Sequence, residues 1–124
     1  MAMIISDIDY HLVLPLSIEE FFTAKMKSDL SLIIPDVLLQ YRAGVKRLEA
    51  TKSRVYLHIS APPDQAPKKI AEDMMWEASL RLIRVNEQLK GFVSVFDGRM
   101  FIKSGAKPSK KQISDFVTIS NSGI

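Results

Sequence analysis

Three side chains near the start of the sequence are the first that could do chemistry. Asp7, Asp9 and His11 alternate along an apolar stretch, Met3 to Leu14, that is typical of a β-strand, so all three project from one face. Carboxylates and imidazoles bind divalent metals, but neighbours on one face of a strand lie about 7 Å apart, which is wide for a shared ion. The polar outer face of an ordinary half-exposed strand explains the same pattern, and we predict no metal site.

A second imidazole, His58, lies beside Tyr56 on the polar side of a predicted strand from Ser53 to Ser60. If this strand pairs with the first, His58 would meet His11 and form an acid–base couple. The rest of the chain supplies no further part of a catalytic set, because it has no cysteine and its five glycines form neither a phosphate-binding loop nor a dinucleotide fingerprint. We therefore expect no catalytic residues, no cofactor and no enzymatic activity.

The segment from Phe92 to Lys111 combines aromatic rings with cations. Two alternating runs, Phe92–Phe96 and Arg99–Lys103, flank Asp97-Gly98, a dipeptide favoured in the tight turn of a β-hairpin. The spacing predicts a C-terminal hairpin with two different faces, since side chains alternate along each strand. One face would be apolar, and the other would carry Phe92, Ser94, Phe96, Arg99, Phe101 and Lys103.

Two arrangements fit the aromatic and basic face of this hairpin. An open face can stack unpaired bases on its rings while its cations hold phosphates, as in proteins that bind single strands. A helix lying over the same face would bury the rings and leave the charged tips at the rim. In the first arrangement the predicted contacts with nucleic acid are Phe96, Arg99, Phe101, Lys103, Lys107, Lys110 and Lys111.

Four helices are expected between and after these strands. A capping box at Ser17 begins a short one, and Pro35 opens the next, which extends to about Ala50. Pro67 opens the longest helix, which extends to about Lys90. A short terminal helix, Lys110–Phe116, follows the hairpin.

The order of these elements predicts an α+β fold in a single small domain over residues 1–119, followed by a frayed C-terminal tail at 120–124. One mixed or antiparallel sheet, formed by the N-terminal strand, the Ser53–Ser60 strand and the C-terminal hairpin, would be covered by two or three helices. The longest helix, about Pro67–Lys90, is apolar on more than one side, which is typical of a helix in the middle of a domain or at a subunit interface. The candidate interface residues are Met74, Met75 and Trp76.

Composition narrows the classes of function. The lack of cysteine excludes disulfides and thiolate metal sites and fits a reducing compartment, so we expect a cytoplasmic protein. We expect no contact with a membrane, since no segment approaches the ~20 apolar residues of a span. The formal net charge of +3 and the pI near 9.2 favour a polyanionic partner.

These observations lead to one main hypothesis of function and one alternative. The main hypothesis is a small non-enzymatic binding domain that contacts nucleic acid through its aromatic and basic hairpin. The alternative is a protein-interaction or assembly subunit, either a homo-oligomer or an adaptor, that uses the apolar long helix and the hairpin.

Overall fold

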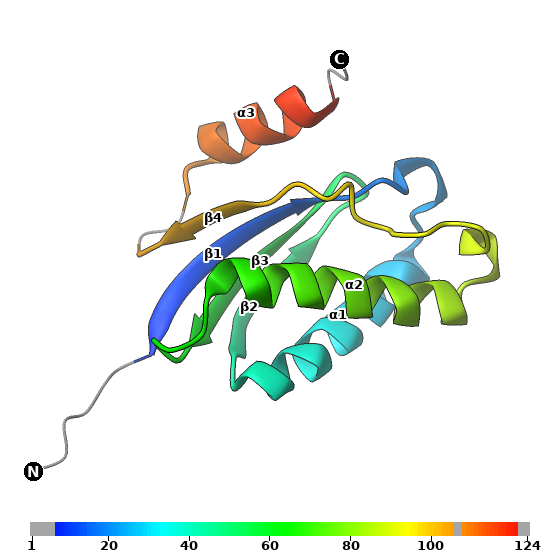
Figure 1. Ribbon diagram of the computed structural model, residues 1–124. Helices are drawn as coiled ribbons and strands as arrows, with labels where there is room; N and C mark the ends of the chain where they lie inside the picture. The colour runs from blue at the N-terminus through cyan, green and yellow to red at the C-terminus, as the bar shows by residue number, and fades with distance from the viewer. Residues whose placement is uncertain (1–6, 106–107, 122–124) are drawn as a thin grey trace, which may run out of the picture.

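The computed structural model describes residues 7–105 and 108–121, with side chains through Phe116. A four-stranded antiparallel sheet in the order β2-β3-β1-β4 forms its centre. The strands are β1 (Ile8–Pro15), β2 (Gly44–Ala50), β3 (Arg54–Ala61) and β4 (Phe101–Ser104). Helices α1 (Ala24–Leu38) and α2 (Pro67–Val85) cover one face of the sheet, and α3 (Lys110–Asn121) lies on the other (Figure 1). The predicted α+β fold, with one sheet covered by helices, is confirmed.

The central pair of strands follows the alternation of the sequence. In the antiparallel register of β1 and β3, Leu12 lies opposite Leu57 and Val13 lies opposite Tyr56. Because side chains alternate between faces, the two leucines enter the core beneath α1 and α2, whereas Val13 and Tyr56 face α3. The second predicted strand is confirmed within one residue at either end. The first is confirmed from the start of β1, and its residues 3–6 lie outside the described part of the chain.

Helix α1 begins later than the predicted capping box. Thr23 caps it, and the Thr23 hydroxyl accepts a hydrogen bond from the backbone N–H of Met26 at 3.2 Å. Glu19–Phe21 forms only a short 3₁₀ turn, η1. Ser17 donates its hydroxyl proton to the carbonyl of Ser94 at 3.2 Å. The predicted capping box at Ser17 is therefore wrong, because the Ser17 side chain bonds to the distant Ser94 instead of to a helix end.

The predicted helix from Pro35 to Ala50 is also wrong. Pro35 lies inside α1 rather than at the start of a new helix. A 3₁₀ turn, η2 (Leu39–Tyr41), and Arg42 in the left-handed conformation, with φ of 57°, end the helical segment. The chain then enters β2, whose Val45 and Leu48 pack against the main core. The apolar residues of this stretch suit a helix and a strand, and pairing with β3 decides between them.

Helix α2 opens at Pro67 as predicted but ends at Val85, five residues before the predicted end. Asn86 follows it as the C-cap, and a 3₁₀ turn, η3 (Glu87–Leu89), comes next. In the described part of the chain, no helix combines the length and the apolar composition that a membrane span requires.

The predicted C-terminal hairpin is wrong. Its second run forms β4, which pairs with β1 rather than with the first run, so that Phe101 lies opposite Val13. In the first run, Phe96 makes a single bridge with Leu16, just past the end of β1. Both runs line up along β1 instead of along each other, because this arrangement buries Val95 and Phe96 in the main core.

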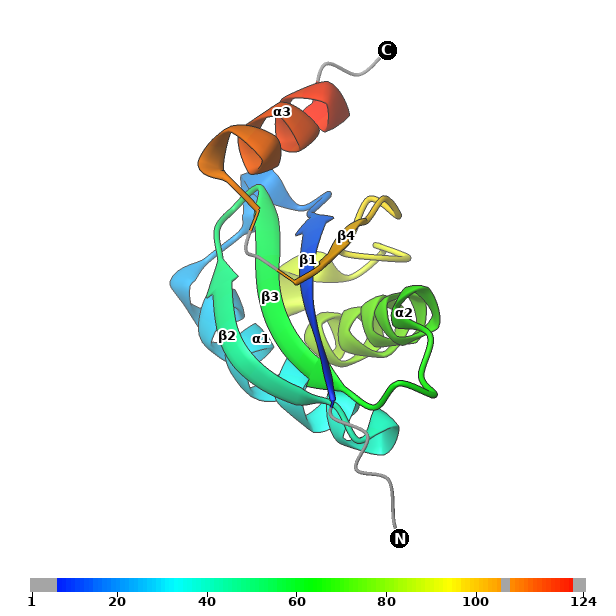
Figure 2. The same cartoon turned by 90° about the vertical axis from the view of Figure 1, so that its left-hand side faces the viewer.

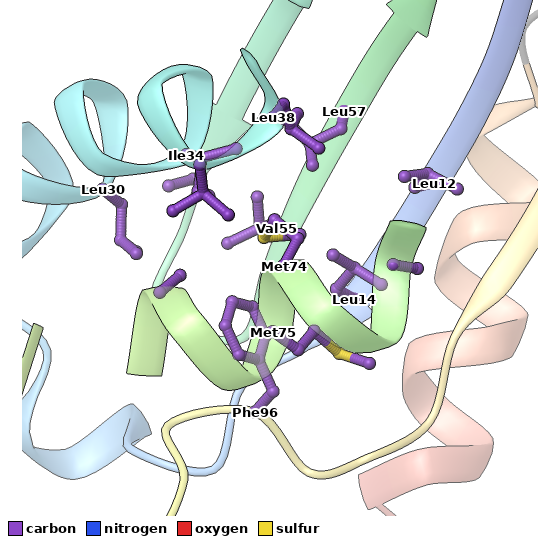
Figure 3. Close-up of a cluster of buried hydrophobic side chains, with 14 of the residues drawn as sticks. Leu12, Leu14, Leu30, Ile34, Leu38, Val55, Leu57, Met74, Met75 and Phe96 are labelled. Carbon is purple, nitrogen blue, oxygen red and sulfur yellow. The ribbon is translucent and has the colours of Figure 1, made fainter. Parts of the chain in front are cut away.

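The buried side chains form two separate clusters. The main core lies between the sheet and helices α1 and α2 and includes Leu12, Leu14, Leu30, Ile34, Leu38, Val55, Leu57, Met74, Met75 and Phe96 (Figure 3). A smaller cluster lies beneath α3 on the opposite face and consists of Val13, Tyr56, Phe101, Ile113 and Phe116. The sheet is therefore covered on both faces, but by very different amounts of apolar surface.

Helix α3 follows a reciprocal cap between Ser109 and Gln112. The Ser109 hydroxyl accepts from the Gln112 N–H at 3.1 Å, and the Gln112 side-chain oxygen accepts from the Ser109 N–H at 2.8 Å. The helix starts at Lys110 as predicted and extends to Asn121, past the predicted end. Residues 120 and 121 of the expected frayed tail are thus helical, and residues 122–124 lie outside the described part of the chain.

Candidate functional site

Four nitrogen-bearing side chains form a line across the sheet. Arg47 of β2 lies opposite His58 of β3, which lies opposite His11 of β1, which lies opposite Lys103 of β4. Residues directly opposite one another on paired strands share a face, so all four belong to the face of the sheet that is turned away from α1 and α2. We call Arg47, His58, His11 and Lys103 the basic row.

The two imidazoles at the centre of the basic row are in contact. Their ring centroids lie 4.3 Å apart in a stacked arrangement. The predicted meeting of His11 and His58 across paired strands is therefore confirmed. His58 Nε2 lies 3.7 Å from Asp9 Oδ2, and Asp9 also pairs with Lys46 Nζ at 3.0 Å.

The hydrogen bonds of His11 define the tautomer of its neutral ring. Nε2 lies 2.8 Å from the carbonyl oxygen of Gly105, so Nε2 must carry the proton that it donates. Nδ1 then accepts a hydrogen bond from the hydroxyl of Tyr56 at 2.7 Å. Both ring nitrogens of His11 are occupied, and neither is left to coordinate an ion. Within the described residues, no group of three or more carboxylate or imidazole side chains is arranged to hold a metal.

Burial, hydrogen bonds and neighbouring charges shift the pKa values of Asp9 and His11. The Asp9 carboxylate is stabilised first by its hydrogen bond to Lys46, which lowers the Asp9 pKa below its ordinary value. Burial lowers the pKa of His11 and outweighs the Gly105 hydrogen bond, which acts in the opposite direction. His58 and Lys103, on either side of it, lower the pKa of His11 further. His11 is therefore neutral at pH 7.

This lowered pKa predicts how stability depends on pH. The folded-state pKa of His11 lies below the unfolded value of 6.5, so the unfolded chain takes up a proton first as the pH falls. We expect the His11 contribution to the free energy of unfolding to be complete above pH 6.5 and to decline below it. Urea unfolding at about pH 7.5 and about pH 5.5 measures the change. A His11→Gln variant should show a smaller change, and an equal change in both proteins would contradict the assignment to His11.

The structure places the predicted nucleic-acid contacts in several different surroundings. Phe96 is only 3% exposed in the main core, so its ring cannot stack on a base. Phe101 is half-buried, and its ring lies 5.7 Å from that of Phe116 on α3. Lys103 belongs to the basic row, whereas Arg99 lies apart from it in a loop and pairs with Asp97 at 2.9 Å.

The remaining predicted contacts lie on or next to α3. Lys110 and Lys111 are exposed in its first turn, and Lys111 pairs with Asp115 at 2.8 Å. Lys107 lies outside the described residues. Lys103, Lys110 and Lys111 therefore all belong to the side of the sheet that carries the basic row and α3.

Sequence reasoning missed the contribution of β2 to this face. The predicted helix from Pro35 to Ala50 contains both Lys46 and Arg47, so it places neither near the histidines. The alternation around them was the available signal, but a bulge between Val45 and Arg47 shifts the register and hides it.

The residues predicted as a subunit interface do not form one surface. Met74 and Met75 lie in the main core between α2 and the sheet (Figure 3). Trp76 is 58% exposed on the outer side of α2, near Leu80 one turn further along the helix. The core of its own domain thus explains most of the apolar width of α2, and the helix leaves Trp76, Leu80 and Val85 exposed.

Comparison with known proteins identifies the class of fold. No protein-family model matches the sequence, and no curated protein sequence matches it. The structure is similar to a "putative transposase" from Deinococcus radiodurans, with a TM-score of 0.85 and 15% sequence identity over 96% of this chain and 95% of that chain. It is also similar to a REP-associated tyrosine transposase bound to a REP hairpin, with a TM-score of 0.59 and 8% identity over 99% of this chain and 73% of that chain. The chain therefore has a transposase-like α+β fold.

The expectation of a protein without enzymatic activity is wrong in the light of these comparisons. Both of these solved structures are described as transposases, and transposases are enzymes. Sequence motifs gave no sign of this relationship because it lies in the arrangement of the backbone, with no more than 15% of the residues identical.

Proposed function

We propose that this chain is a nucleic-acid-binding domain of the transposase-like fold and that the cationic ends of the basic row, Arg47 and Lys103, contact the phosphates of a bound strand. The observation that carries the proposal is the alignment of Arg47, His58, His11 and Lys103 across all four strands. The two cations at the ends of the row, Arg47 and Lys103, are suited to a polyanionic backbone, because each can meet a phosphate oxygen. Arg47 would exchange its contact with Glu49 Oε1, at 2.7 Å, for a phosphate, whereas His11 is buried and bonded through both ring nitrogens and acts only in holding Tyr56 and the Gly105 carbonyl.

Other cations near the basic row support a binding site on this face of the sheet and not on the face covered by α1 and α2. Arg54 of β3 has the same orientation as Tyr56 and His58, since it lies two residues before Tyr56. Lys110 and Lys111 add exposed cations from α3. One of the transposases that share the fold was solved with a hairpin bound to it, which agrees with a nucleic-acid ligand.

Binding of a DNA hairpin with a single-stranded tail tests the proposal. We expect a fluorescein-labelled hairpin of this kind to bind, as measured by fluorescence anisotropy, and to bind more weakly as salt rises from about 50 to about 200 mM. An Arg47→Ala/Lys103→Ala double variant should weaken binding about tenfold at the lower salt. Its plot of log affinity against log salt should be shallower by roughly 1.4 to 1.8, because two phosphate contacts are lost.

A matched control removes the same charge from the other side of the molecule. Lys27 on α1 and Lys68 on α2 are exposed on the helical layer. A Lys27→Ala/Lys68→Ala double variant should bind within about twofold of the wild type, since neither lysine faces the proposed site. Equal losses in the two double variants, or an affinity that does not fall with salt, would overturn the phosphate contacts.

A further inference from the structure

A second line of side chains runs across the sheet next to the basic row. Tyr56 of β3 lies opposite Val13 of β1, which lies opposite Phe101 of β4. Each of these residues is two positions along its strand from a member of the basic row, so the two lines share a face. We call Tyr56, Val13 and Phe101 the aromatic row.

Helix α3 covers the aromatic row. Its Ile113 and Phe116 pack on Tyr56, Val13 and Phe101, and the rings of Phe101 and Phe116 lie 5.7 Å apart. Figure 2 shows α3 set apart from α1 and α2, across the sheet from them. The contact is a separate cluster from the main core, so the main core stays closed whether or not α3 is in place.

The aromatic row has the composition of a surface on which bases stack. Proteins that bind single strands place aromatic rings on the open face of an antiparallel sheet and cations beside them, so that the rings take the bases and the cations take the phosphates. Here the two rings are held by strands and not by loops. The hydroxyl of Tyr56 is also tied to Nδ1 of His11, at 2.7 Å, which links the aromatic row to the basic row.

We propose that the aromatic row is a base-stacking surface that α3 covers in the free protein. A single strand whose phosphates are held by the cationic ends of the basic row, as proposed above, displaces Ile113 and Phe116 and stacks bases on Tyr56 and Phe101. The inference rests on the proposed function and adds its ligand class, a single-stranded nucleic acid, and its regulation by α3. The displacement of α3 by bases changes the free energy little, because removing two apolar side chains from their contacts costs about as much as stacking two bases contributes.

Two substitutions test the role of the aromatic row and the role of α3 separately. The probe is a labelled oligothymidylate of about twelve nucleotides, which has no secondary structure of its own. Phe101→Leu keeps an apolar side chain beneath α3 but removes the ring, and we expect roughly tenfold weaker binding. Ile113→Ala loosens the cover, and we expect binding about three times tighter. Phe21→Leu is the control, because Phe21 is 44% exposed and contacts Phe92, away from both rows.

Hydrogen exchange tests the displacement directly. We expect the backbone amides of residues 110–121 to exchange faster when the oligothymidylate is bound, and those of β1 and β3 to be unchanged or slower. Thermal unfolding first confirms that the three variants are folded. One outcome would overturn the stacking proposal and leave the proposed function standing. In it, the oligothymidylate binds and the Arg47→Ala/Lys103→Ala variant binds it more weakly, but Phe101→Leu binds it as Phe21→Leu does and exchange of the α3 amides is unchanged. If neither the oligothymidylate nor the hairpin binds, both proposals fail.

Discussion

Replacing Phe96 by alanine is expected to destabilise the protein by about 3–5 kcal/mol, the usual cost of deleting a buried phenylalanine ring. The ring is 3% exposed and lies in the main core with Leu14 and Met75 (Figure 3). The surrounding sheet and helix can relax only partly into the space left behind, so the loss combines lost burial with an unfilled cavity. Urea unfolding followed by circular dichroism measures the difference, provided that the slope of the transition is unchanged.

Val93 supplies a matched control for this substitution within the same segment. Its side chain is 77% exposed, so Val93→Ala should change the free energy of unfolding by no more than about 0.5 kcal/mol. The pair also distinguishes two arrangements of the segment. In the predicted hairpin with an open aromatic face, Val93 belongs to the buried apolar face and Phe96 to the exposed one, so the order of the two effects would be reversed. A larger loss for Val93→Ala than for Phe96→Ala would therefore contradict the structure.

Replacing Asn86 by alanine is expected to cost about 1–3 kcal/mol, because the change removes three hydrogen bonds and takes from the Leu82 carbonyl the buried donor that Asn86 supplies. Asn86 is 3% exposed. Its side-chain nitrogen donates to Asp29 Oδ2 and to the carbonyl of Leu82, both at 3.0 Å, and its oxygen accepts from Lys25 Nζ at 3.3 Å. The Asn86 side chain thus caps the C-terminal end of α2 and links it by hydrogen bonds to α1. Thermal and urea unfolding of the variant measure the cost.

The neighbouring residue Gln88 controls for the position of this substitution in the chain. Gln88 is exposed in η3, two residues after Asn86, and Gln88→Ala should leave the free energy of unfolding within about 0.5 kcal/mol of the wild type. Equal costs for the two variants would mean that the loss at Asn86 comes from the backbone of the turn and not from its hydrogen bonds.

Some elements of this fold are predictable from local patterns. The strand around Leu57 alternates strictly, Pro67 marks the start of the long helix, and Ser109 marks the start of the last one. In each case the periodicity agrees with the local start signal, where there is one, and long-range contacts favour the same structure. The pairing of His11 with His58 was predictable for the same reason, since both lie on the polar side of clearly alternating strands.

Other elements depend on partners that are distant in the sequence. The residues around Val45 and Leu48 suit a helix as well as a strand, and only the free edge of β3 makes them a strand. The run that contains Phe96 has the alternation of a hairpin strand, but the core beneath α2 offers the ring more burial than a hairpin would. Local propensity differs little between such alternatives, and the burial of apolar surface in the whole domain decides between them.

The sequence alone determined the α+β class, three of the four strand positions in outline, the long helix and the polar character of the His11 and His58 face. Tertiary structure decided that the remaining strand, β2, comes from the Val45 region and that Phe96 is a core residue. It also decided that Arg47 and Lys103 complete a row with the two histidines. A row across four strands joins residues as far apart as 11 and 103, and its existence depends on the register of every pair between them. Register is set by which faces the packed domain buries, and that is a property of the assembled sheet and helices together.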